Sequence, residues 1–308
     1  MINRVLIRLK VIQVVYAYYK NSGKSIKAAE DEVFFSLSKS YDLYKFLLLL
    51  IVAVTRYAAD RISFNMRKVR PTASDINPNL KFVNNRLAAQ IEANEELIKF
   101  SEKSKLDWVN YSDFLRRLLD TIVESDIYKE YMESPTSSYE EDRELWRKLY
   151  KNFIFNNEDL DTLLEELSLY WNDDKAIVDT FVLKTIKRFD ENNGADQELL
   201  PEFKDDDDQE FARRLFRRAI LNCDYYRHLI SENTKNWELD RVAFMDVIIM
   251  QCALAEILSF PNIPISVSLN EYVEIAKAYS TNKSGSFVNG TLDGIVKELK
   301  KEGKLAKA

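Results

Sequence analysis

The chain has 308 residues, of which 46% are apolar and 31% are charged, and its formal net charge is −6. It contains only six glycines and six prolines, about a third of their usual combined share, so sandwiches, barrels and doubly wound sheets are disfavoured and an all-α fold is expected. One histidine, His228, cannot form a multi-histidine metal site, and two cysteines without CxxC spacing indicate neither a zinc motif nor a disulfide framework.

Basic residues are concentrated at the start of the chain. Residues 1–70 contain 13 Lys and Arg but only 5 Asp and Glu, a net charge of +8, whereas the rest of the chain has a net charge of −14. Such a segment either attracts phosphate groups or simply keeps helix faces solvated. The longest apolar run, residues 46–54, is far shorter than the roughly 20 residues that cross a bilayer, and the first residues do not resemble a signal peptide. We therefore expect a cytoplasmic protein without a membrane segment.

The first 20 residues predict an amphipathic helix. Apolar and aromatic side chains recur there every three or four positions, namely Val5, Leu9, Ile12, Tyr16 and Tyr19. Polar and basic side chains project from its other faces, namely Arg4, Arg8, Lys10 and Gln13. Cations of this kind can displace counterions from phosphates, and Tyr16, Tyr18 and Tyr19 could stack on unpaired bases. For Tyr16 and Tyr19, packing in the core is the alternative, because both belong to the apolar stripe.

Three parts of the chain are predicted from its helix-breaking segments. A second helical stretch runs from near Ser25 toward Arg67, with a break near Lys39 and Ser40 left open. Residues 70–78 contain two prolines and form a linker, and a second boundary follows Gly194 and Pro201. We therefore expect a basic helical segment over 1–70, a helical middle domain over 71–204 without recognisable chemistry, and a helical core over 205–308.

An acidic run is followed by an arginine-rich helix at the start of the third part. Residues 205–208 are four consecutive aspartates, which favour an acidic helix start over a divalent cation site. In the helix after them, Arg213 lies over Arg217 and Arg214 over Arg218, an arrangement that is mildly unfavourable without partners. Either the preceding aspartates or bound phosphates could supply those partners.

The last 70 residues predict three helices. Residues 242–258 are apolar nearly all round and indicate a central buried helix, on which Asp246 needs either a partner's cation or an internal partner. A capping box over Ser268–Glu271 predicts the start of the next helix, whose inner face is expected to carry Leu269, Val273, Ala276 and Tyr279. Gly285 is expected to break the chain before a last helix that opens near Phe287.

Catalytic signatures are missing from the sequence. There is no GxGxxG or GxSxG, a HExxH motif is impossible with one histidine, and the glycines at 285 and 290 lack the Lys-Ser/Thr of a phosphate loop. We expect a protein that is not an enzyme and that needs no cofactor or metal.

Four segments resemble signatures of the NusB transcription antitermination family, in the same order and with similar spacing. They are Arg4-x3-Arg8-x4-Gln13-Val14-Val15-Tyr16-Ala17, Asp246-x9-Glu256-Ile257-Leu258, Ile263-Pro264-x4-Leu269-Asn270-Glu271, and Phe287-Val288-Asn289-Gly290-x-Leu292-Asp293. The resemblance covers about the first 20 residues and about 100 residues from near Phe211 onward. Because the family core needs only about half of this length, residues 71–204 are interpreted as an inserted helical domain.

The resemblance implies two packed units of three to four helices and no catalysis. It also implies binding of boxA-type single-stranded RNA together with ribosomal protein NusE, to promote antitermination in ribosomal RNA operons, with indirect links to other antitermination factors and RNA polymerase. The RNA-binding candidates are Arg4, Arg8, Lys10, Gln13, Phe287 and Asn289. The candidates for binding the protein partner are Tyr16, Asp240 and Asp246. For Phe287 and Asn289, core packing and helix capping are the alternatives.

A second hypothesis is a helical scaffold that docks transcription or ribosome-assembly partners without binding RNA. Its motivation is that Val5 and Leu6 occupy positions of the first helix where the family often has cations.

Overall fold

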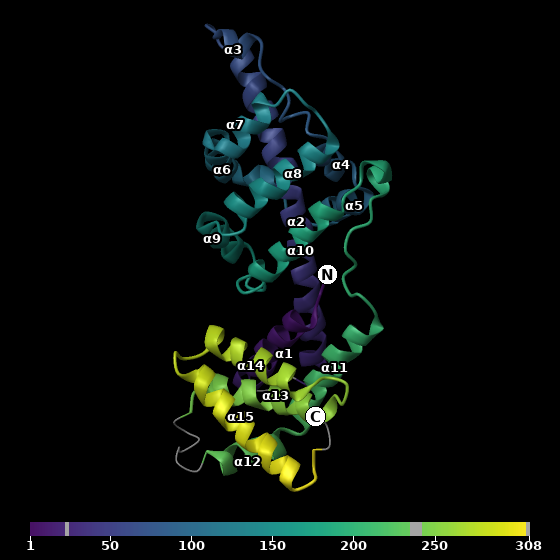
Figure 1. Ribbon diagram of the computed structural model, residues 1–308, viewed down its shortest axis with the longest axis vertical. Helices are drawn as coiled ribbons and strands as arrows, with labels where there is room; N and C mark the ends of the chain where they lie inside the picture. Colours follow the sequence, from purple (N-terminus) through teal and green to yellow (C-terminus); the bar gives the residue numbers. More distant parts are fainter. Residues whose placement is uncertain (22–24, 235–241, 306–308) are drawn as a thin grey trace. The chain divides into compact units, whose positions relative to one another are not determined.

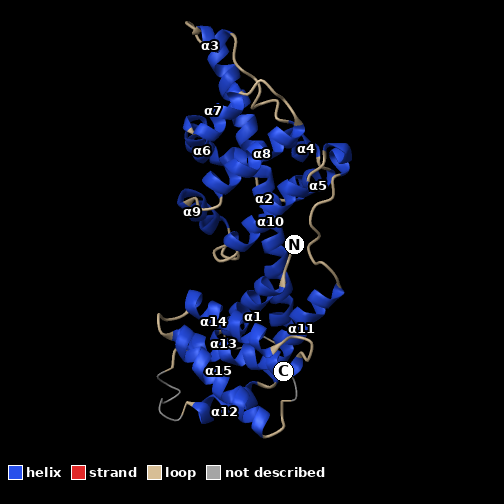
Figure 2. Cartoon of the chain, in the orientation of Figure 1, coloured by secondary structure: helices blue, strands red, loops and turns tan. Residues whose placement is uncertain are grey.

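The computed structural model describes residues 1–21, 25–234 and 242–305, and these fold almost entirely into helices (Figure 2). No strand occurs in these ranges, where the β-type contact is an isolated bridge between Ile2 and Phe203. The α-helices, labelled in Figure 1, are α1 (Arg4–Lys20), α2 (Ile26–Met66), α3 (Ala73–Ile76), α4 (Arg86–Ala93), α5 (Glu95–Lys103), α6 (Ser112–Glu124), α7 (Asp126–Glu133), α8 (Tyr139–Leu149), α9 (Glu158–Leu167), α10 (Lys175–Arg188), α11 (Asp206–Leu221), α12 (Cys223–Asn233), α13 (Phe244–Ser259), α14 (Ile265–Tyr279) and α15 (Ser284–Lys301). Between them lie the 3-10 helices η1 (Trp108–Tyr111) and η3 (Glu191–Asp196) and the π-helix η2 (Tyr150–Ile154). The expected all-α fold is confirmed.

The chain divides into two compact units. Unit 1 consists of Met1 and residues 39–202, and unit 2 of residues 2–38 and 203–308. Helix α2 continues through Lys39 and Ser40 without a break and contributes to both units. The first structural division therefore lies at 38/39 and not at the predicted 70/71, because residues 39–66 continue a helix whose side chains pack within unit 1. The second division, at 202/203, lies two residues before the predicted boundary.

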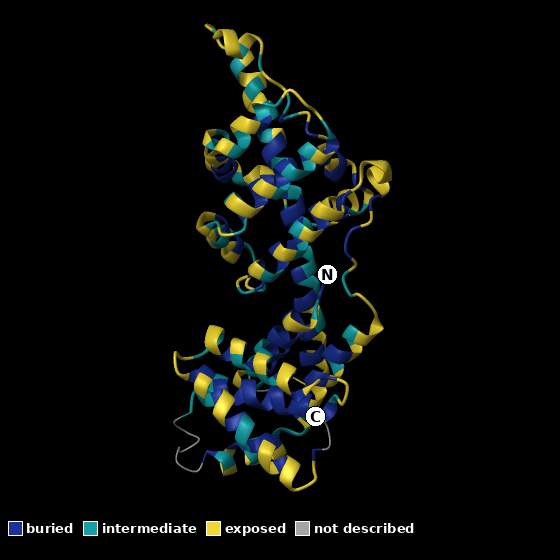
Figure 3. Ribbon diagram, in the orientation of Figure 1, coloured by how far each residue is buried: buried dark blue, intermediate teal, exposed yellow. Residues whose placement is uncertain are grey.

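Helix α13 forms the centre of unit 2. Almost all of its residues are buried (Figure 3), and α1, α11, α12, α14 and α15 pack against it. This agrees with the central buried helix expected over residues 242–258, although the helix begins at Phe244. A helix that is apolar on every side needs neighbours on every side, and these five helices supply them.

Two helix starts in unit 2 differ from the sequence-based prediction. Helix α14 begins at Ile265, directly after Pro264, so Ser268 lies inside its first turns with its hydroxyl donating to Glu256 Oε1 over 2.7 Å. The predicted capping box is therefore wrong. Of the predicted inner face only Ala276 is buried, together with Ile265, Ser268, Tyr272 and Ile275, whereas Leu269, Val273 and Tyr279 are half-buried. Helix α15 begins at Ser284 and includes Gly285, so Gly285 does not break the chain as expected; a side chain at that position would meet the Lys277 side chain.

Aromatic side chains fill much of the core of unit 1. The Phe46 ring stacks on the Trp108 ring with centroids 4.1 Å apart. It also contacts the Trp171 ring, whose centroid lies 5.9 Å from that of Phe46. The Trp108 indole N–H donates to the Phe46 carbonyl over 2.8 Å. Helix α8 packs against α4, α7 and α10, and its Trp146 is completely buried. These large side chains each bury a large area and so contribute much of the packed core of unit 1.

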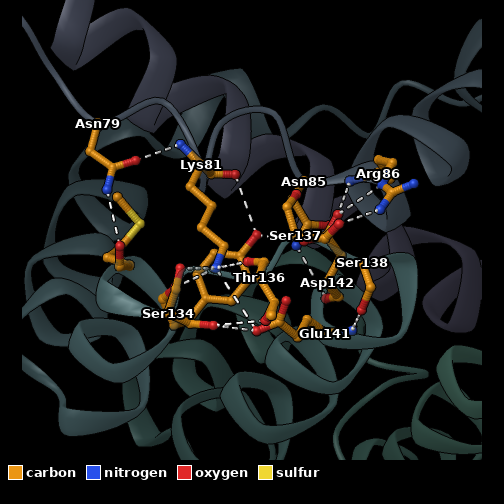
Figure 4. A network of polar contacts seen from close by, with 12 residues as sticks. Asn79, Lys81, Asn85, Arg86, Ser134, Thr136, Ser137, Ser138, Glu141 and Asp142 are labelled. Atoms are coloured by element: carbon orange, nitrogen blue, oxygen red, sulfur yellow. Dashed lines mark hydrogen bonds and ion pairs between the residues drawn. The ribbon is translucent and has the colours of Figure 1, made fainter.

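A polar network ties the segment after the linker to the loop between α7 and α8 (Figure 4). The Lys81 ammonium donates to the carbonyl oxygens of Tyr131, Ser134 and Thr136 over 2.7, 3.1 and 2.7 Å. Asn85 caps α4 and donates from its amide to the Asp142 carbonyl over 3.1 Å. Buried polar groups of this kind stabilise a fold when each of them has a partner.

Candidate nucleic-acid interface

The start of α1 presents Arg4 at the surface of unit 2. Asn3 caps the helix by accepting a hydrogen bond from the Leu6 amide over 2.9 Å. The Arg4 side chain remains 43% exposed, pairs with Asp208 Oδ1 at 3.2 Å, and lies 5.0 Å from the centroid of the Phe211 ring. An exposed pair of this kind contributes little to stability, so the guanidinium can exchange Asp208 for another anion.

Arg8 has a different environment, although it is one helical turn away. Its side chain is buried, with Nε and Nη2 each 2.8 Å from the two carboxylate oxygens of Glu256, and Glu271 lies 3.5 Å away. Ser268 and Tyr272 donate their hydroxyls to the same Glu256 carboxylate over 2.7 and 3.1 Å. Burial lowers the pKa of Arg8, but the hydrogen bonds and charge of Glu256 outweigh it and leave that pKa above its ordinary value. The guanidinium would have to break this network to reach a phosphate.

The other polar candidates of α1 are also covered to different degrees. Lys10 is almost completely buried, and Gln13 is half-buried. Helix α1 is buried on most sides because it packs against both α11 and α13. More of α1 is therefore buried than the apolar stripe predicts. Val5 is the opposite case, because it belongs to that stripe but is 36% exposed.

The arginines of α11 fall into two groups. Arg213 and Arg217 both pair with the buried carboxylate of Glu30 in α2, with Arg217 Nη2 3.1 Å and Arg213 Nε 3.6 Å from Oε1. Their repulsion is relieved by Glu30, a third arrangement beside the two expected from sequence. Arg214 and Arg218 are exposed and form no ion pair within the part of the chain that the structure describes.

The acidic run before these arginines behaves as an acidic helix start. Asp205 is the N-cap of α11 and accepts from the Asp208 amide over 3.3 Å, and the next three aspartates occupy the first turn. Within the described ranges, no group of three His, Cys, Asp or Glu side chains is placed to hold a metal ion. No helix among the same residues has the length and apolar character needed to cross a membrane.

A pair of phenyl rings joins the exposed cations of α1 and α11. Phe211 and Phe260 meet edge to face with centroids 4.9 Å apart, Arg4 lies over Phe211, and Arg214 lies 4.9 Å from the Phe260 centroid. We call Arg4, Arg214, Phe211 and Phe260 the arginine–phenyl cluster. Sequence reasoning found Arg4 and the arginine-rich helix but missed the rings, because Phe211 and Phe260 are 49 positions apart and read as ordinary core residues.

Phe287 and Asn289 lie near the start of α15, where Phe287 is half-buried and Asn289 is exposed. Helix α15 packs against α12, α13 and α14, whereas α1 packs against α11 and α13. Both helices that carry predicted RNA-binding residues are thus supported by α13. Asn289 does not cap α15, because that helix already begins at Ser284.

The structure describes two of the three residues predicted to bind the protein partner. Tyr16 is half-exposed, with its ring 5.4 Å from Phe244 and the Lys20 ammonium 5.7 Å from its centroid. Asp246 is buried and accepts from the Ser284 hydroxyl over 2.8 Å through Oδ2, while Oδ1 has no hydrogen-bond partner among the described residues. Asp240 lies outside the residues that the structure describes.

A further polar cluster of unit 2 was not predicted. Gln251 donates to the Tyr19 hydroxyl over 3.0 Å and to the Ala219 carbonyl over 2.7 Å, and accepts from Arg227 over 3.1 Å. The Arg227 guanidinium lies 4.3 Å from the Tyr19 centroid. Burial is the main reason why the pKa of Tyr19 rises to about 12. The cluster fixes the end of α1 against α12 and α13.

Comparison with known proteins places these observations in a family. The model of the NusB family matches residues 176–297. The transcription antitermination protein NusB of Salinibacter ruber is 36% identical over 132 residues, which are 41% of this chain and 82% of that protein. The same protein from Chloroherpeton thalassium is 41% identical over 100 residues, 32% of this chain and 47% of the relative, and that from Finegoldia magna is 43% identical over 90 residues, 29% and 66%. No solved structure gives a significant match.

Proposed function

This chain belongs to the NusB family, and on that premise we propose that it binds boxA-type single-stranded RNA together with ribosomal protein NusE and promotes antitermination in ribosomal RNA operons. The family match and the NusB relatives support a NusB-like, non-enzymatic role in transcription antitermination. The observation that carries the proposal is the similarity to the Salinibacter ruber protein, which covers 82% of that relative. We place the activity in the cytoplasm, with RNA polymerase and other antitermination factors contacted indirectly.

The arginine–phenyl cluster supports RNA binding at unit 2. Arg4 and Arg214 are exposed cations held over two apolar rings, and neither is committed to a buried carboxylate. Phosphates bind such cations by releasing counterions, and the planar guanidinium can also stack on a base. We propose Arg4, Arg214, Gln13, Phe287 and Asn289 as the residues that contact RNA directly.

We propose a supporting role for Arg8 and Lys10 in that site. Both are buried, and the Arg8 guanidinium is bound to Glu256, so its contribution is to hold α1 against α13 and α14. A phosphate at Arg8 would require a conformation in which that ion pair opens, at the cost of leaving Glu256 buried without its cation.

The protein partner would bind at Tyr16, Asp246 and Asp240. Tyr16 supports this proposal by its half-exposed ring, and Asp246 by a carboxylate oxygen without a hydrogen-bond partner among the described residues. An arginine or lysine of NusE would complete the hydrogen bonding of that oxygen.

The test is a titration of labelled boxA-type RNA with the full chain, with and without NusE, at several stated salt concentrations. We expect binding that is tighter with NusE and that weakens with salt. The variant Arg4→Ala plus Arg214→Ala removes two exposed cations, so the slope of log affinity against log salt should become shallower by about 1.4. The control Lys300→Ala plus Lys301→Ala removes two exposed cations of α15 and should leave the slope almost unchanged.

No binding of boxA RNA in the presence or absence of NusE would exclude the proposal. In that case the scaffold hypothesis gains support, because two of the three predicted cations of α1 are buried. Its own test is capture of the same partners by the full chain before and after ribonuclease treatment.

A further inference from the structure

Unit 1 contains a cleft of about 800 Å³ that carries an excess of positive charge. The cleft lies between α2, α5, the loop after α5 and the segment after α9. Five lysines line it, namely Lys39, Lys45, Lys99, Lys103 and Lys105, against two carboxylates, Asp42 and Glu96. None of the lining residues falls within the family match at 176–297 or within unit 2, so the site lies beyond the function proposed above.

Both carboxylates of the cleft are already neutralised by lysines. The Lys39 ammonium lies 2.8 Å from Asp42, and the Lys45 ammonium lies 3.0 Å from Glu96. Glu96 also accepts the Tyr41 hydroxyl over 2.9 Å, which fixes its position. The remaining three lysines therefore set the charge that a ligand would meet.

Those three lysines are exposed and available. Lys99 pairs with Glu95 one turn away, but both side chains are more than 60% exposed, and such pairs contribute only a few tenths of a kcal/mol. The ammonium groups of Lys103 and Lys105 form no ion pair with any described residue. Unpaired lysines gathered at one cleft favour an anionic ligand with several charges.

Aromatic side chains give the same cleft apolar walls. Phe100 and Trp171 line it and are almost completely buried, while Tyr170 is half-exposed. Trp171 is held in place by its indole N–H, which donates to the Lys39 carbonyl over 2.8 Å, and by its contact with Phe46. A base entering the cleft would therefore meet the half-exposed Tyr170 ring beside the lysines, and a ring next to cations is the combination by which proteins bind single strands.

The chain around the cleft lacks the usual means of holding a free nucleotide's terminal phosphates. Residues 39–193 contain no glycine, so no glycine-rich loop can wrap a phosphate there. The lysines instead come from two helices and a loop, which spreads their charges along the cleft. This distribution matches a series of phosphates better than a single point of high charge.

We propose that this cleft binds a short stretch of single-stranded RNA. The phosphates contact Lys99, Lys103 and Lys105, and a base packs against the half-exposed ring of Tyr170. The volume of about 800 Å³ accommodates a few nucleotides but not a duplex. Binding depends on charge and stacking, so it does not need the boxA sequence.

The first experiment maps contacts on the full chain. A ten-nucleotide oligouridylate with 4-thiouridine substitutions is cross-linked by light, and the linked peptides are identified by mass spectrometry. We expect cross-links within residues 99–106 and 167–171. Cross-links confined to unit 2 would overturn the proposal, since they would leave the cleft without RNA.

The second experiment removes the unpaired lysines. Lys103→Ala plus Lys105→Ala should reduce cross-linking at 99–106 and 167–171 on the order of tenfold and flatten its salt dependence. The matched control is Lys129→Ala plus Lys187→Ala, two exposed lysines of unit 1 that line no part of the cleft. Equal losses in both variants would overturn the proposal, and unchanged circular dichroism verifies that both double variants remain folded.

Competition distinguishes RNA from other anions. Uridine monophosphate or a ten-residue polyglutamate at equal concentration should displace the oligouridylate weakly; displacement as effective as by unlabelled RNA would identify a nucleotide or acidic-peptide site and overturn the proposal. The boxA titration with the Arg4→Ala plus Arg214→Ala variant tests the site proposed in unit 2, and its outcome does not depend on whether the cleft of unit 1 binds RNA. Cleft cross-links that persist in that variant would uphold this site even if unit 2 bound no RNA.

Discussion

Each unit contains a buried cation paired with a buried carboxylate, but the two pairs are built differently. In unit 2 the Arg8 guanidinium meets Glu256 through two parallel hydrogen bonds, with Ser268 and Tyr272 on the same carboxylate. In unit 1 the Lys175 ammonium lies 2.8 Å from Asp179 and also donates to the carbonyls of Ile154 and Phe155. The comparison shows that arginine concentrates its bonds on one partner, whereas lysine divides them among several.

Burial shifts the pKa of one group at each of these two sites. Burial raises the pKa of Asp179 to about 6, against the opposing effects of the Lys175 charge and the Tyr150 hydroxyl. In unit 2, burial together with the charge of Glu256 raises the pKa of the Tyr272 hydroxyl well above its ordinary value. The pair in unit 1 is therefore sensitive to mild acid.

The largest expected effect comes from Arg8→Ala. It leaves Glu256 buried without a cation, so unit 2 should lose about 3–5 kcal/mol of unfolding free energy. The measurement is urea unfolding followed by hydrogen exchange on peptides of α13, since a chain with two units need not unfold in one step. The double variant Arg8→Met plus Glu256→Leu should recover most of the loss; a double variant as unstable as Arg8→Ala would contradict this explanation.

A smaller loss is expected for Lys175→Met in unit 1. Asp179 can take up a proton when its cation is removed, because its pKa already lies near 6, so the cost should be about 2 kcal/mol at pH 7. Hydrogen exchange on peptides of α10 gives the measurement, with exposed Lys187→Met on the same helix as the control. A cost equal to that of Arg8→Ala would show that the two pairs do not differ as proposed.

The acid response of Asp179 gives the third prediction. The folded pKa of about 6 exceeds the unfolded value of about 3.9, so the folded state gains stability as pH falls through 6 and loses it as pH rises. The variant Asp179→Asn lacks this titration. Its stability deficit relative to the natural sequence should therefore be larger at pH 5 than at pH 7.5, by about 1–2 kcal/mol. A deficit independent of pH over this range would show that Asp179 keeps its charge.

The smallest effects should follow removal of one hydroxyl from each site. Tyr150→Phe takes away a donor 2.6 Å from Asp179, which retains only Lys175 among side-chain donors that the structure describes, and should cost about 1.5 kcal/mol. Tyr272→Phe leaves Glu256 with Arg8 and Ser268 and should cost about 0.5–1 kcal/mol. Thermal unfolding of both variants, compared at pH 7, tests this order; the reverse order would argue against a better supported carboxylate in unit 2.

Much of the fold was predictable from the sequence because its signals are local. The scarcity of glycine and proline predicts helices, and the apolar run of residues 242–258 predicts the buried helix at the centre of unit 2. The predicted start of α14 is wrong because Ser268 resembles a cap in sequence but is used by Glu256 in the fold, and that of α15 is wrong because Gly285 lies within the helix. A residue with two physical uses cannot be assigned from spacing alone.

The candidate sites were less predictable because their partners are distant in sequence. Nothing near Arg8 indicates that Glu256, 248 positions away, neutralises it, and nothing near Arg217 indicates Glu30. Lys103 and Lys105 likewise resemble ordinary surface charges until the fold places Trp171 and Tyr170 in the same cleft. Exposure, which decides whether a cation is available to a ligand, is a property of the folded chain.

The Lys81 network of Figure 4 has a consequence for how unit 1 responds to its surroundings. Three backbone carbonyls converge on the ammonium, an arrangement by which some proteins coordinate a potassium ion. Here the cation is covalently attached to the chain, so it cannot be diluted, exchanged or competed away. The loop between α7 and α8 therefore keeps its conformation whatever the supply of monovalent ions, and acetylation of Lys81 would remove the charge that the carbonyls surround.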